Sequence, residues 1–224
     1  AGLSLGEYSA LVASGALRFS EAVALVQKRG QYMTEAAPQG TGKMVAVMNA
    51  EREVIEKACQ EASAFGIVAP ANYNTPQQIV IGGEVAAVDQ AMTLLKEAGV
   101  KRMIPLNVSG PFHTALLQPA SKKLAQDLAK LNFQTMQIPV ISNTTAEIMP
   151  QEAIQALLEK QVMSAVRFED SIETMKAMNV GTMIEVGPGK TLTGFVKKID
   201  KTIEMHRVED VATLTETLTA LTGR

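Results

Sequence analysis

A serine near the start of the chain has the spacing of a catalytic nucleophile. Ser4 lies between Gly2 and Gly6 in the run AGLSLGEYSA, which gives the pattern G-x-S-x-G. This pattern is typical of a sharp turn from a strand into a helix, with the serine held at the tip in a strained backbone conformation. Small residues are expected on both sides because such a turn brings neighbouring backbone close. The spacing alone leaves a chance occurrence in a glycine-containing loop as the alternative.

A serine nucleophile needs a base within hydrogen-bond reach, and the chain offers two histidines. His206 lies among charged residues in TIEMHRVED, so we expect it on a solvated strand or loop. His113 lies in SGPFHTALL, in a loop that opens a helix, and catalytic groups are often placed in such loops. His113 is therefore the candidate base, and a core-packed or exposed histidine is the alternative.

Arg29 falls on the apolar face of a predicted helix that runs from about Glu21 to Glu35. Projected at about 100° per residue, this face gathers Ala22, Leu25, Val26, Tyr32 and Met33. An unpaired guanidinium there would be costly to desolvate, so it needs a carboxylate partner. The partner is either an acid of the chain itself or a substrate carboxylate held by two parallel N–H···O bonds.

The bulk composition excludes several classes of protein. The chain has 224 residues, a net charge of −2 and a single cysteine, Cys59. The charge does not suggest a nucleic-acid binder, and no uncharged apolar run reaches the roughly 18 residues needed to span a membrane. Cys59 and the histidines lack metal-ligand spacing. We therefore expect a cytoplasmic protein without a cofactor or metal.

A run with the look of a phosphate loop does not match that motif. The run GPGKTLTG occupies 187–194, and the phosphate-loop pattern requires a glycine five places before Gly189. That position is Ile184. The sequence therefore argues against ATP or GTP binding.

The predicted elements fall into two groups. Strands are predicted over 43–50, 66–74, 77–83 and 100–107, with helices over 51–65 and 84–99. The order βαββαβ predicts that 42–107 form an inserted ferredoxin-like α+β subdomain, an antiparallel sheet covered on one face by two helices. Strands alternate with helices in 1–41 and 108–224, which predicts an α/β core with a mostly parallel sheet.

Individual residues mark the expected ends of the core elements. Gly15 is expected to end a helix over 4–14 in the left-handed conformation, and Ser20 to cap the next helix. Pro119 suits the first turn of a helix. A strand leading into a polar turn is expected over 137–146, and a strand ending in a Gly-Pro-Gly loop over 182–189. Helices are expected over 152–162, 167–178 and 190–199.

Five motifs in order resemble the malonyl-CoA:acyl carrier protein transacylase family. They are GLSLGEYSALVASGAL, LVQKRGQYM, NYNTPQQIVIGG, SGPFHTALL and IEVGPGKTLTG. The resemblance runs through essentially the whole chain, including the ferredoxin-like insert. It implies a hydrolase-like core and an S-malonyltransferase of fatty acid biosynthesis, which moves malonyl from malonyl-CoA to the phosphopantetheine thiol of acyl carrier protein.

The resemblance implies a role for each matching residue. The implied catalytic residues are Ser4 as the acylated nucleophile, His113 as the base, Leu5 as an oxyanion N–H donor, and Gln161, whose backbone carbonyl orients the histidine. The implied substrate residues are Arg29 for the malonyl carboxylate, Asn74 at the entrance used by the carrier, and Phe112, which goes with malonyl rather than methylmalonyl. An acidic carrier suggests a basic docking patch, for which the candidates are Lys122, Lys123, Lys197, Lys198 and Lys201; ordinary solvated helix faces are the alternative.

The chain departs from the family pattern in two places. Leu3 stands where relatives often have histidine, which we interpret as tolerated variation because that side chain is not the base. The family also has an upstream loop that supplies a second oxyanion N–H, and nothing like it precedes Ser4, so we expect the chain to be a fragment. A serine thioesterase or esterase and a non-catalytic carrier-binding module are the alternative functions.

Overall fold

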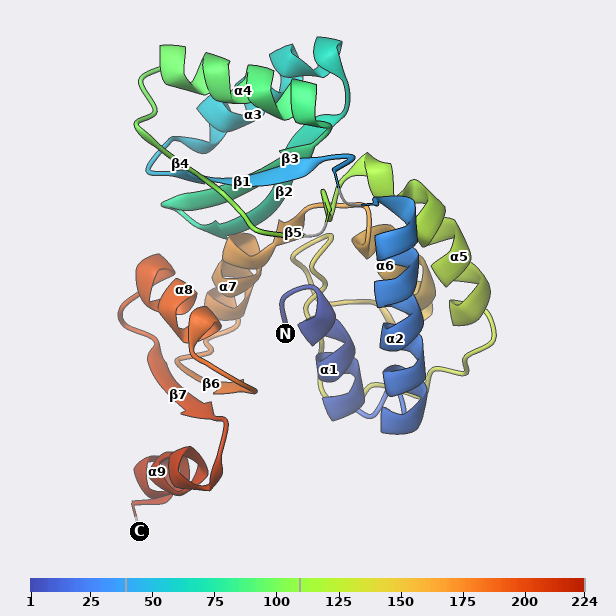
Figure 1. Cartoon of the computed structure of the whole chain (residues 1–224). Helices are drawn as coiled ribbons and strands as arrows, with labels where there is room; N and C mark the ends of the chain where they lie inside the picture. The colour runs from blue at the N-terminus through green and yellow to red at the C-terminus, as the bar shows by residue number, and fades with distance from the viewer. Residues whose placement is uncertain (39, 109, 224) are drawn as a thin grey trace. The chain divides into compact units, whose positions relative to one another are not determined.

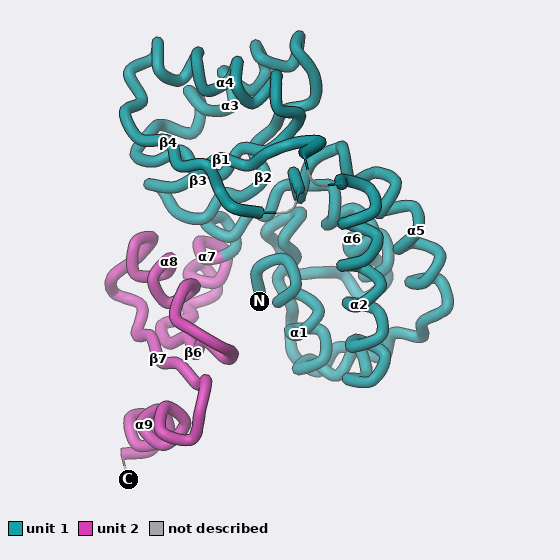
Figure 2. The backbone as a smooth tube through the Cα atoms, viewed as in Figure 1, with its two compact units in different colours: residues 1–171 teal, residues 172–224 magenta. Residues whose placement is uncertain are grey.

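The computed structural model describes residues 1–38, 40–108 and 110–223. The chain divides into two compact units, Ala1–Ser171 and Ile172–Arg224, which Figure 2 colours separately. The fold is α/β with a mixed sheet. The residues singled out for catalysis and for substrate binding lie in the first unit, whereas His206 and the docking candidates Lys197, Lys198 and Lys201 lie in the second.

An antiparallel sheet with two helices forms one part of the first unit. Its elements are β1 (Lys43–Met48), α3 (Arg52–Ala62), β2 (Val68–Thr75), β3 (Gln78–Gly83), α4 (Val85–Glu97) and β4 (Arg102–Pro105). The strand order is β4-β1-β3-β2-β5, in which β5 (Val166–Arg167) joins β2 in parallel and the other pairs are antiparallel. Figure 1 shows α3 and α4 on one face of this sheet. The predicted βαββαβ order is confirmed.

The period-two alternation of β1 explains why both faces of the sheet are covered. Val45 and Val47 pack into a core with the side chains of α3 and α4, where Leu95 is fully buried. Met44 and Ala46 point to the opposite face, where Phe112 packs against them. The second face of the sheet therefore meets the loop that carries His113.

Four helices form the second part of this unit. They are α1 (Leu5–Ala13), α2 (Phe19–Ala36), α5 (Gln118–Leu128) and α6 (Ile154–Gln161). Their shared core includes Tyr8, Leu11, Leu25, Leu124 and Leu158. Short 3-10 turns lie at Ser63–Phe65, Ala115–Leu117 and Gln151–Ala153.

The helix ends agree with the sequence at two positions and differ at a third. Gly15 has a φ of 81°, the left-handed conformation expected after α1, and Pro119 lies in the first turn of α5. The predicted cap at Ser20 is wrong. Arg18 is the N-cap residue, with extended backbone, and its ion pair with Glu21 at 3.4 Å spans the first turn of α2. The helix therefore begins two residues earlier than predicted.

Of the strand and polar turn predicted over 137–146, the strand is wrong and the turn is confirmed at 143–145. The described residues of this segment form an isolated bridge between Ile141 and Ile148. Asn143 shows the reason: its N–H donates to the Glu7 side chain and its carbonyl accepts from the Arg167 N–H, so no single neighbouring strand pairs with it. Parallel pairing among the described residues occurs between β2 and β5 and within the second unit, so the mostly parallel core stays a prediction.

The second unit is a small β-α-β arrangement with flanking helices. Its elements are β6 (Thr182–Val186), α8 (Thr191–Ile199), β7 (Glu204–Val208) and α9 (Val211–Thr222), and α7 (Phe168–Ala177) spans the boundary. The strands β6 and β7 pair in parallel. Strand β7 contains His206, for which a solvated strand or loop is expected from the sequence. Helix α9 is absent from the predicted set, because this threonine-rich segment depends on a capping box between Asp210 and Thr213.

At the glycine-rich loop, carboxylates accept hydrogen bonds from the backbone N–H groups that a bound phosphate would need. The Glu185 side chain accepts from the N–H groups of Leu192 and Thr193 at 3.0 and 2.7 Å, and Glu209 accepts from Gly189 N–H at 2.6 Å. These bonds are consistent with the mismatch between GPGKTLTG and the phosphate-loop motif. Across the described ranges, no helix combines the length and apolar character needed to cross a membrane.

Candidate active site

Ser4 lies at a strained turn directly before α1. Its backbone has φ 52° and ψ −102°, a conformation that a residue with a side chain rarely adopts. A Cβ on Gly2 would lie 2.2 Å from the carbonyl carbon of Gly6, so only glycine fits at position 2. A Cβ on Gly6 meets no described atom within 4 Å. Close packing therefore requires the first glycine of the motif and not the second.

Asn143 ties the two sides of this turn together. Its Oδ1 accepts from the Ser4 N–H at 2.6 Å, and its Nδ2 donates to the Gly2 carbonyl at 2.6 Å. The residue is buried, so both bonds are shielded from water. A side chain 139 residues away in the sequence thus holds the turn in shape.

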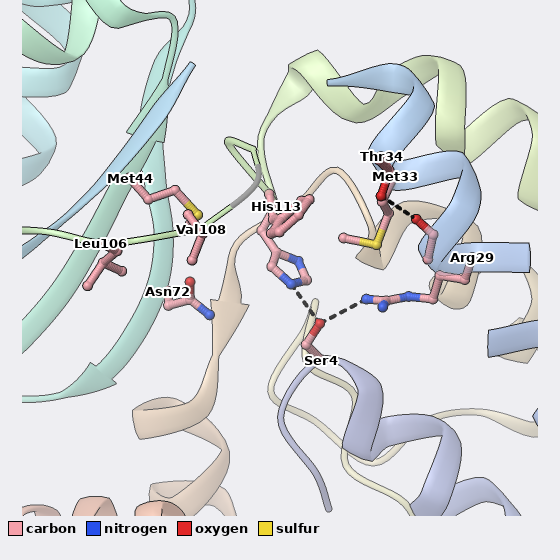
Figure 3. Close-up of a pocket in the computed structure, with 11 residues that line it drawn as sticks. Ser4, Arg29, Met33, Thr34, Met44, Asn72, Leu106, Val108 and His113 are labelled. Atoms are coloured by element: carbon pink, nitrogen blue, oxygen red, sulfur yellow. Dashed lines mark hydrogen bonds between the residues drawn. The ribbon is translucent and has the colours of Figure 1, made fainter. Parts of the chain in front are cut away.

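Ser4, His113 and Gln161 form a continuous hydrogen-bond chain. The Ser4 Oγ lies 2.7 Å from His113 Nε2, and His113 Nδ1 lies 3.0 Å from the backbone carbonyl of Gln161 (Figure 3). Because a carbonyl only accepts, Nδ1 carries the proton and Nε2 is free to accept from the serine hydroxyl. The arrangement is a serine–histidine pair in the tautomer that a general base requires.

The electrostatics of the site keep His113 neutral. The side chain is buried, and burial lowers the pKa of the imidazole to about 4, with the positive charge of Arg29 acting in the same direction. Hydrogen bonds from the ring to backbone carbonyls oppose this shift. The imidazole is therefore an available proton acceptor throughout the neutral pH range.

Arg29 approaches the same serine oxygen from the side opposite His113 (Figure 3). Its Nη2 donates to Ser4 Oγ at 2.8 Å and to Gln161 Oε1 at 3.1 Å, and its guanidinium lies over the Tyr8 ring at 5.4 Å from the centroid. Its Nε is buried without a partner among the described residues. No described carboxylate comes within 4.0 Å of its nitrogen atoms, so no described acid of the chain pairs directly with it.

These side chains open onto a cavity of about 430 Å³. Its polar lining comes from Ser4, Arg29, Thr34, Asn72 and His113, and its apolar lining from Met33, Met44, Leu106, Val108 and Phe112. Figure 3 shows Ser4, His113 and Arg29 close together, with Asn72 beside Val108 and Leu106. The apolar side chains come from both parts of the first unit. The cavity suits a ligand with a compact charged head and a longer, less polar body.

The side chains of Asn74 and Leu5, both singled out in the sequence, do not lie at the reacting atoms. Asn74 is buried in β2, where its Nδ2 donates to Gln78 Oε1 at 2.9 Å, and the cavity is lined instead by Asn72. The Leu5 side chain is exposed, and its N–H is one of the first N–H groups of α1, which have no partner within the helix. Phe112 lines the cavity next to His113.

The sequence analysis missed Asn143, Asn72 and Glu7. Glu7 is fully buried on α1, and burial raises the pKa of its carboxyl group to about 7 against the opposing effect of its hydrogen-bond donors. A helix projection would have found it, because Glu7 lies one turn before buried Leu11 on the apolar face. No local pattern marks Asn143 or Asn72.

The candidate docking lysines are not gathered at this cavity. Lys123 pairs with Glu35 at 2.7 Å on the surface of the first unit, and Lys122 is exposed. Lys197, Lys198 and Lys201 belong to the second unit. The described residues contain no group of three or more His, Cys, Asp or Glu side chains that could hold a metal ion.

Known proteins match this chain over nearly its whole length. The family model for the acyl transferase domain matches residues 1–220. The malonyl CoA-acyl carrier protein transacylase of Bacillus subtilis (strain 168) is 46% identical over 216 residues, which are 96% of this chain and 68% of that protein. The crystal structure of MCAT from Streptococcus pneumoniae is 60% identical with a TM-score of 0.93, covering 95% of this chain and 70% of that one.

A further match includes a bound carrier. A malonyl-transacylase solved in complex with its type II PKS acyl-carrier protein is 43% identical with a TM-score of 0.92, over 99% of this chain and 71% of that one. The chain belongs to the acyl transferase domain family, in its branch of malonyl CoA-acyl carrier protein transacylases.

Proposed function

We propose that this chain is an S-malonyltransferase of fatty acid biosynthesis, which moves a malonyl group from malonyl-CoA to the phosphopantetheine thiol of acyl carrier protein. The observation that carries the proposal is the convergence of His113 and Arg29 on one oxygen, Ser4 Oγ, at 2.7 and 2.8 Å. A base and a cation at one nucleophile fit an acyl group that ends in a carboxylate. The names of the relatives support the same substrate and carrier.

The first half-reaction forms an ester on Ser4. His113 Nε2 takes the hydroxyl proton as Ser4 Oγ attacks the thioester carbonyl, which gives a tetrahedral oxyanion. The N–H of Leu5 lies at the positive end of α1 and donates to that oxyanion. The C–S bond then breaks, His113 returns the proton to the CoA sulfur, and malonyl remains on the serine.

The second half-reaction runs the same steps with the carrier thiol as nucleophile. His113 accepts the thiol proton, the sulfur attacks the malonyl ester, and Ser4 leaves with the proton from His113. The Gln161 carbonyl holds the imidazole in one tautomer during both halves, as a backbone carbonyl can replace the acid of a triad. The reaction is thus a ping-pong transfer without a bound cofactor.

Arg29 sets the selectivity in this scheme. A charge-assisted bond to the malonyl carboxylate contributes about 1.5–3 kcal/mol, and an acetyl group leaves the guanidinium with Ser4 and Gln161 only. Phe112 lines the cavity beside the base and limits the room for a methyl branch on the acyl group. Asn74, at the end of β2, is assigned to the carrier's entrance by the family resemblance alone.

The proposal extends to the finer description of the fold. Residues 42–107 are assigned to a ferredoxin-like subdomain, supported by the strand order β4-β1-β3-β2, and 1–41 with 108–224 to a hydrolase-like core, supported by the elbow at Ser4. A cytoplasmic location follows from the proposed substrates.

The test measures loading of Ser4 by malonyl-CoA and by acetyl-CoA in the wild type and in Arg29→Ala. Lys28→Ala, at the adjacent position of the same helix, is the control. Loading of Ser4 by malonyl should fall about 10- to 150-fold in Arg29→Ala, because the charged bond is lost, while loading by acetyl changes little. Equal losses with both substrates would refute the role of Arg29.

The same assay with holo-acyl carrier protein separates the alternative functions. Malonyl should leave the enzyme only when the carrier thiol is present. Release of free malonate into water without carrier would identify a thioesterase, and carrier binding without any ester on Ser4 would identify a non-catalytic module.

A further inference from the structure

We propose that Glu7 is a positioning residue, the buried acceptor that fixes the side-chain amide of Gln161 and through it places Arg29 for the substrate carboxylate. The inference rests on the proposed function, because it concerns the selectivity of the same serine. Glu7 is not among the residues that line the cavity, and its carboxyl group is bonded to Asn143 and Gln161 rather than to Ser4 Oγ. Its effect on the reaction therefore passes through the residues that it holds.

Glu7 accepts hydrogen bonds from two residues that support the dyad. Its Oε1 accepts from the Asn143 N–H at 3.1 Å, and its Oε2 accepts from Gln161 Nε2. Asn143 holds the Ser4 turn, and the Gln161 backbone holds His113. One buried carboxyl group is thus bonded to the supports of both the nucleophile and the base.

The amide of Gln161 lies between a group that only donates and a group that only accepts. The Arg29 guanidinium can only donate, and it faces Gln161 Oε1 at 3.1 Å. An ionised Glu7 can only accept, and it faces Gln161 Nε2, whose second hydrogen is given to the Ser4 carbonyl at 2.9 Å. These partners allow one orientation of the amide. In the flipped orientation its NH₂ group would face the guanidinium, and its oxygen would face the carboxylate and the Ser4 carbonyl.

This relay also explains how Arg29 stays buried without direct contact with an acid. The negative charge of Glu7 is one amide away from the guanidinium, and each charge lies in the field of the other. The Nη2 atom is held at Ser4, while the buried Nε has no partner among the described residues. The relay thus holds the cation at the edge of the cavity, which Arg29 lines together with Ser4.

The charged groups that face Glu7 come from more than one element. Arg29 lies on α2, Tyr8 lies on the same helix as Glu7, and the amino group of Ala1 precedes the turn. Burial is the main cause of the raised pKa of Glu7, about 7, so the carboxylate titrates close to neutral pH. Protonation turns one of its two accepting oxygens into an O–H donor, so Glu7 no longer acts only as an acceptor, which is what fixes the amide orientation.

The first experiment measures the reactivity of Ser4 without any CoA substrate. A fluorophosphonate probe labels the full chain through an Oγ–P bond with loss of fluoride, and the rate is followed from pH 5 to pH 9. The wild type should show an increase in rate with a midpoint near pH 7, and Glu7→Gln should lack it. Glu185→Gln is the matched control, because Glu185 also accepts two N–H bonds but lies in the second unit.

The second experiment measures the preference for malonyl-CoA over acetyl-CoA. Glu7→Gln should lower this ratio at least tenfold at pH 8, and Glu185→Gln should leave it unchanged. Gln161→Met keeps the backbone carbonyl but removes the amide, so it should lower the ratio as well, and adding Glu7→Gln to it should lower the ratio little further. Gln161→Met alone tests the relay if Glu7→Gln does not fold.

The outcomes separate this inference from the proposed function. A wild-type pH profile retained in Glu7→Gln, or losses of selectivity that multiply in the double variant, would overturn the role of Glu7 even if malonyl is transferred. Conversely, a loss of the pH 7 midpoint in Glu7→Gln with no malonyl loading of the wild type would support Glu7 and overturn the proposed substrate.

Discussion

The antiparallel sheet with α3 and α4 and the cluster around Ser4 are stabilised in different ways. The sheet region buries an apolar core in which Val45, Ile81 and Leu95 are fully shielded. The cluster buries Glu7, Arg29, His113, Asn143 and Gln161, and joins them by hydrogen bonds. The first region tolerates apolar side chains that keep its volume filled, whereas the second depends on specific hydrogen-bond donors and acceptors.

Because of this difference, we expect substitutions in the sheet region to affect mainly stability and those in the cluster to affect mainly activity. Apolar burial is non-directional, so changes in the sheet region alter the free energy of unfolding more than the geometry of the site. Hydrogen bonds in the cluster fix directions, so changes there alter the geometry first. The following predictions test whether the two effects separate as this comparison requires.

The largest effect is expected at the base. His113→Gln removes the proton acceptor but can keep a hydrogen bond to the Gln161 carbonyl, so acylation of Ser4 should slow by about 100- to 10,000-fold. Burst kinetics of CoA release would measure it. A loss of less than tenfold would show that His113 is not the base.

The next effect is expected in the sheet region. Leu95→Ala leaves a cavity between α4 and the sheet and should lower the free energy of unfolding by about 2–5 kcal/mol. Urea denaturation would measure the change. At temperatures where the variant is folded, its kcat/KM for malonyl-CoA should match that of the wild type, and a parallel loss of activity would contradict the separation.

A smaller effect is expected in the pH dependence of stability. The pKa of His113 falls from 6.5 to about 4 on folding, so this group removes stability as the pH falls below 6.5. The pKa of Glu7 rises from 4.5 to about 7, so this group adds stability as the pH falls from 7. The two oppose each other between about pH 4.5 and 6.5.

Glu7→Gln removes the contribution that adds stability as the pH falls, and leaves that of His113. The variant should lose stability on acidification through this range more steeply than the wild type does, as measured by urea midpoints at pH 5, 6 and 7. A slope no steeper than that of the wild type would show that the raised pKa of Glu7 is absent.

The smallest effect is expected at the surface lysines. Lys123 is paired with Glu35 and lies over the Tyr32 ring, and such exposed pairs contribute little to stability because water and salt screen them. Lys123→Ala should therefore change neither the thermal midpoint measurably nor the carrier concentration at half-maximal rate. A large rise in that concentration would instead assign this face to carrier docking.

The sequence predicted elements with a clear period better than it predicted contacts. The βαββαβ region follows from alternation in the strands and from two amphipathic helices, and Arg29 was found because a charge on an apolar face is conspicuous. Glu7 carries the same signal on α1 and was missed. Asn143 could not be found, because its partners Ser4 and Gly2 are more than 130 residues away and no local pattern marks them.

Errors in the predicted elements have a common physical cause. The segment around Asn143 has strand-like composition, but its backbone groups bond to side chains and to separate segments, which no local pattern encodes. Ser20 has the composition of a cap, yet the backbone turns at Arg18. In both places the surroundings outweigh the local preference.

The measurement that tests the central claim most directly is the intact mass of the protein after mixing with malonyl-CoA, for the wild type and for Ser4→Ala. The account predicts an added mass of one malonyl group on the wild type, located on the Ser4 peptide and lost on addition of holo-acyl carrier protein, with no added mass on Ser4→Ala. A wild type that stays unmodified, or an equal adduct on Ser4→Ala, would contradict it.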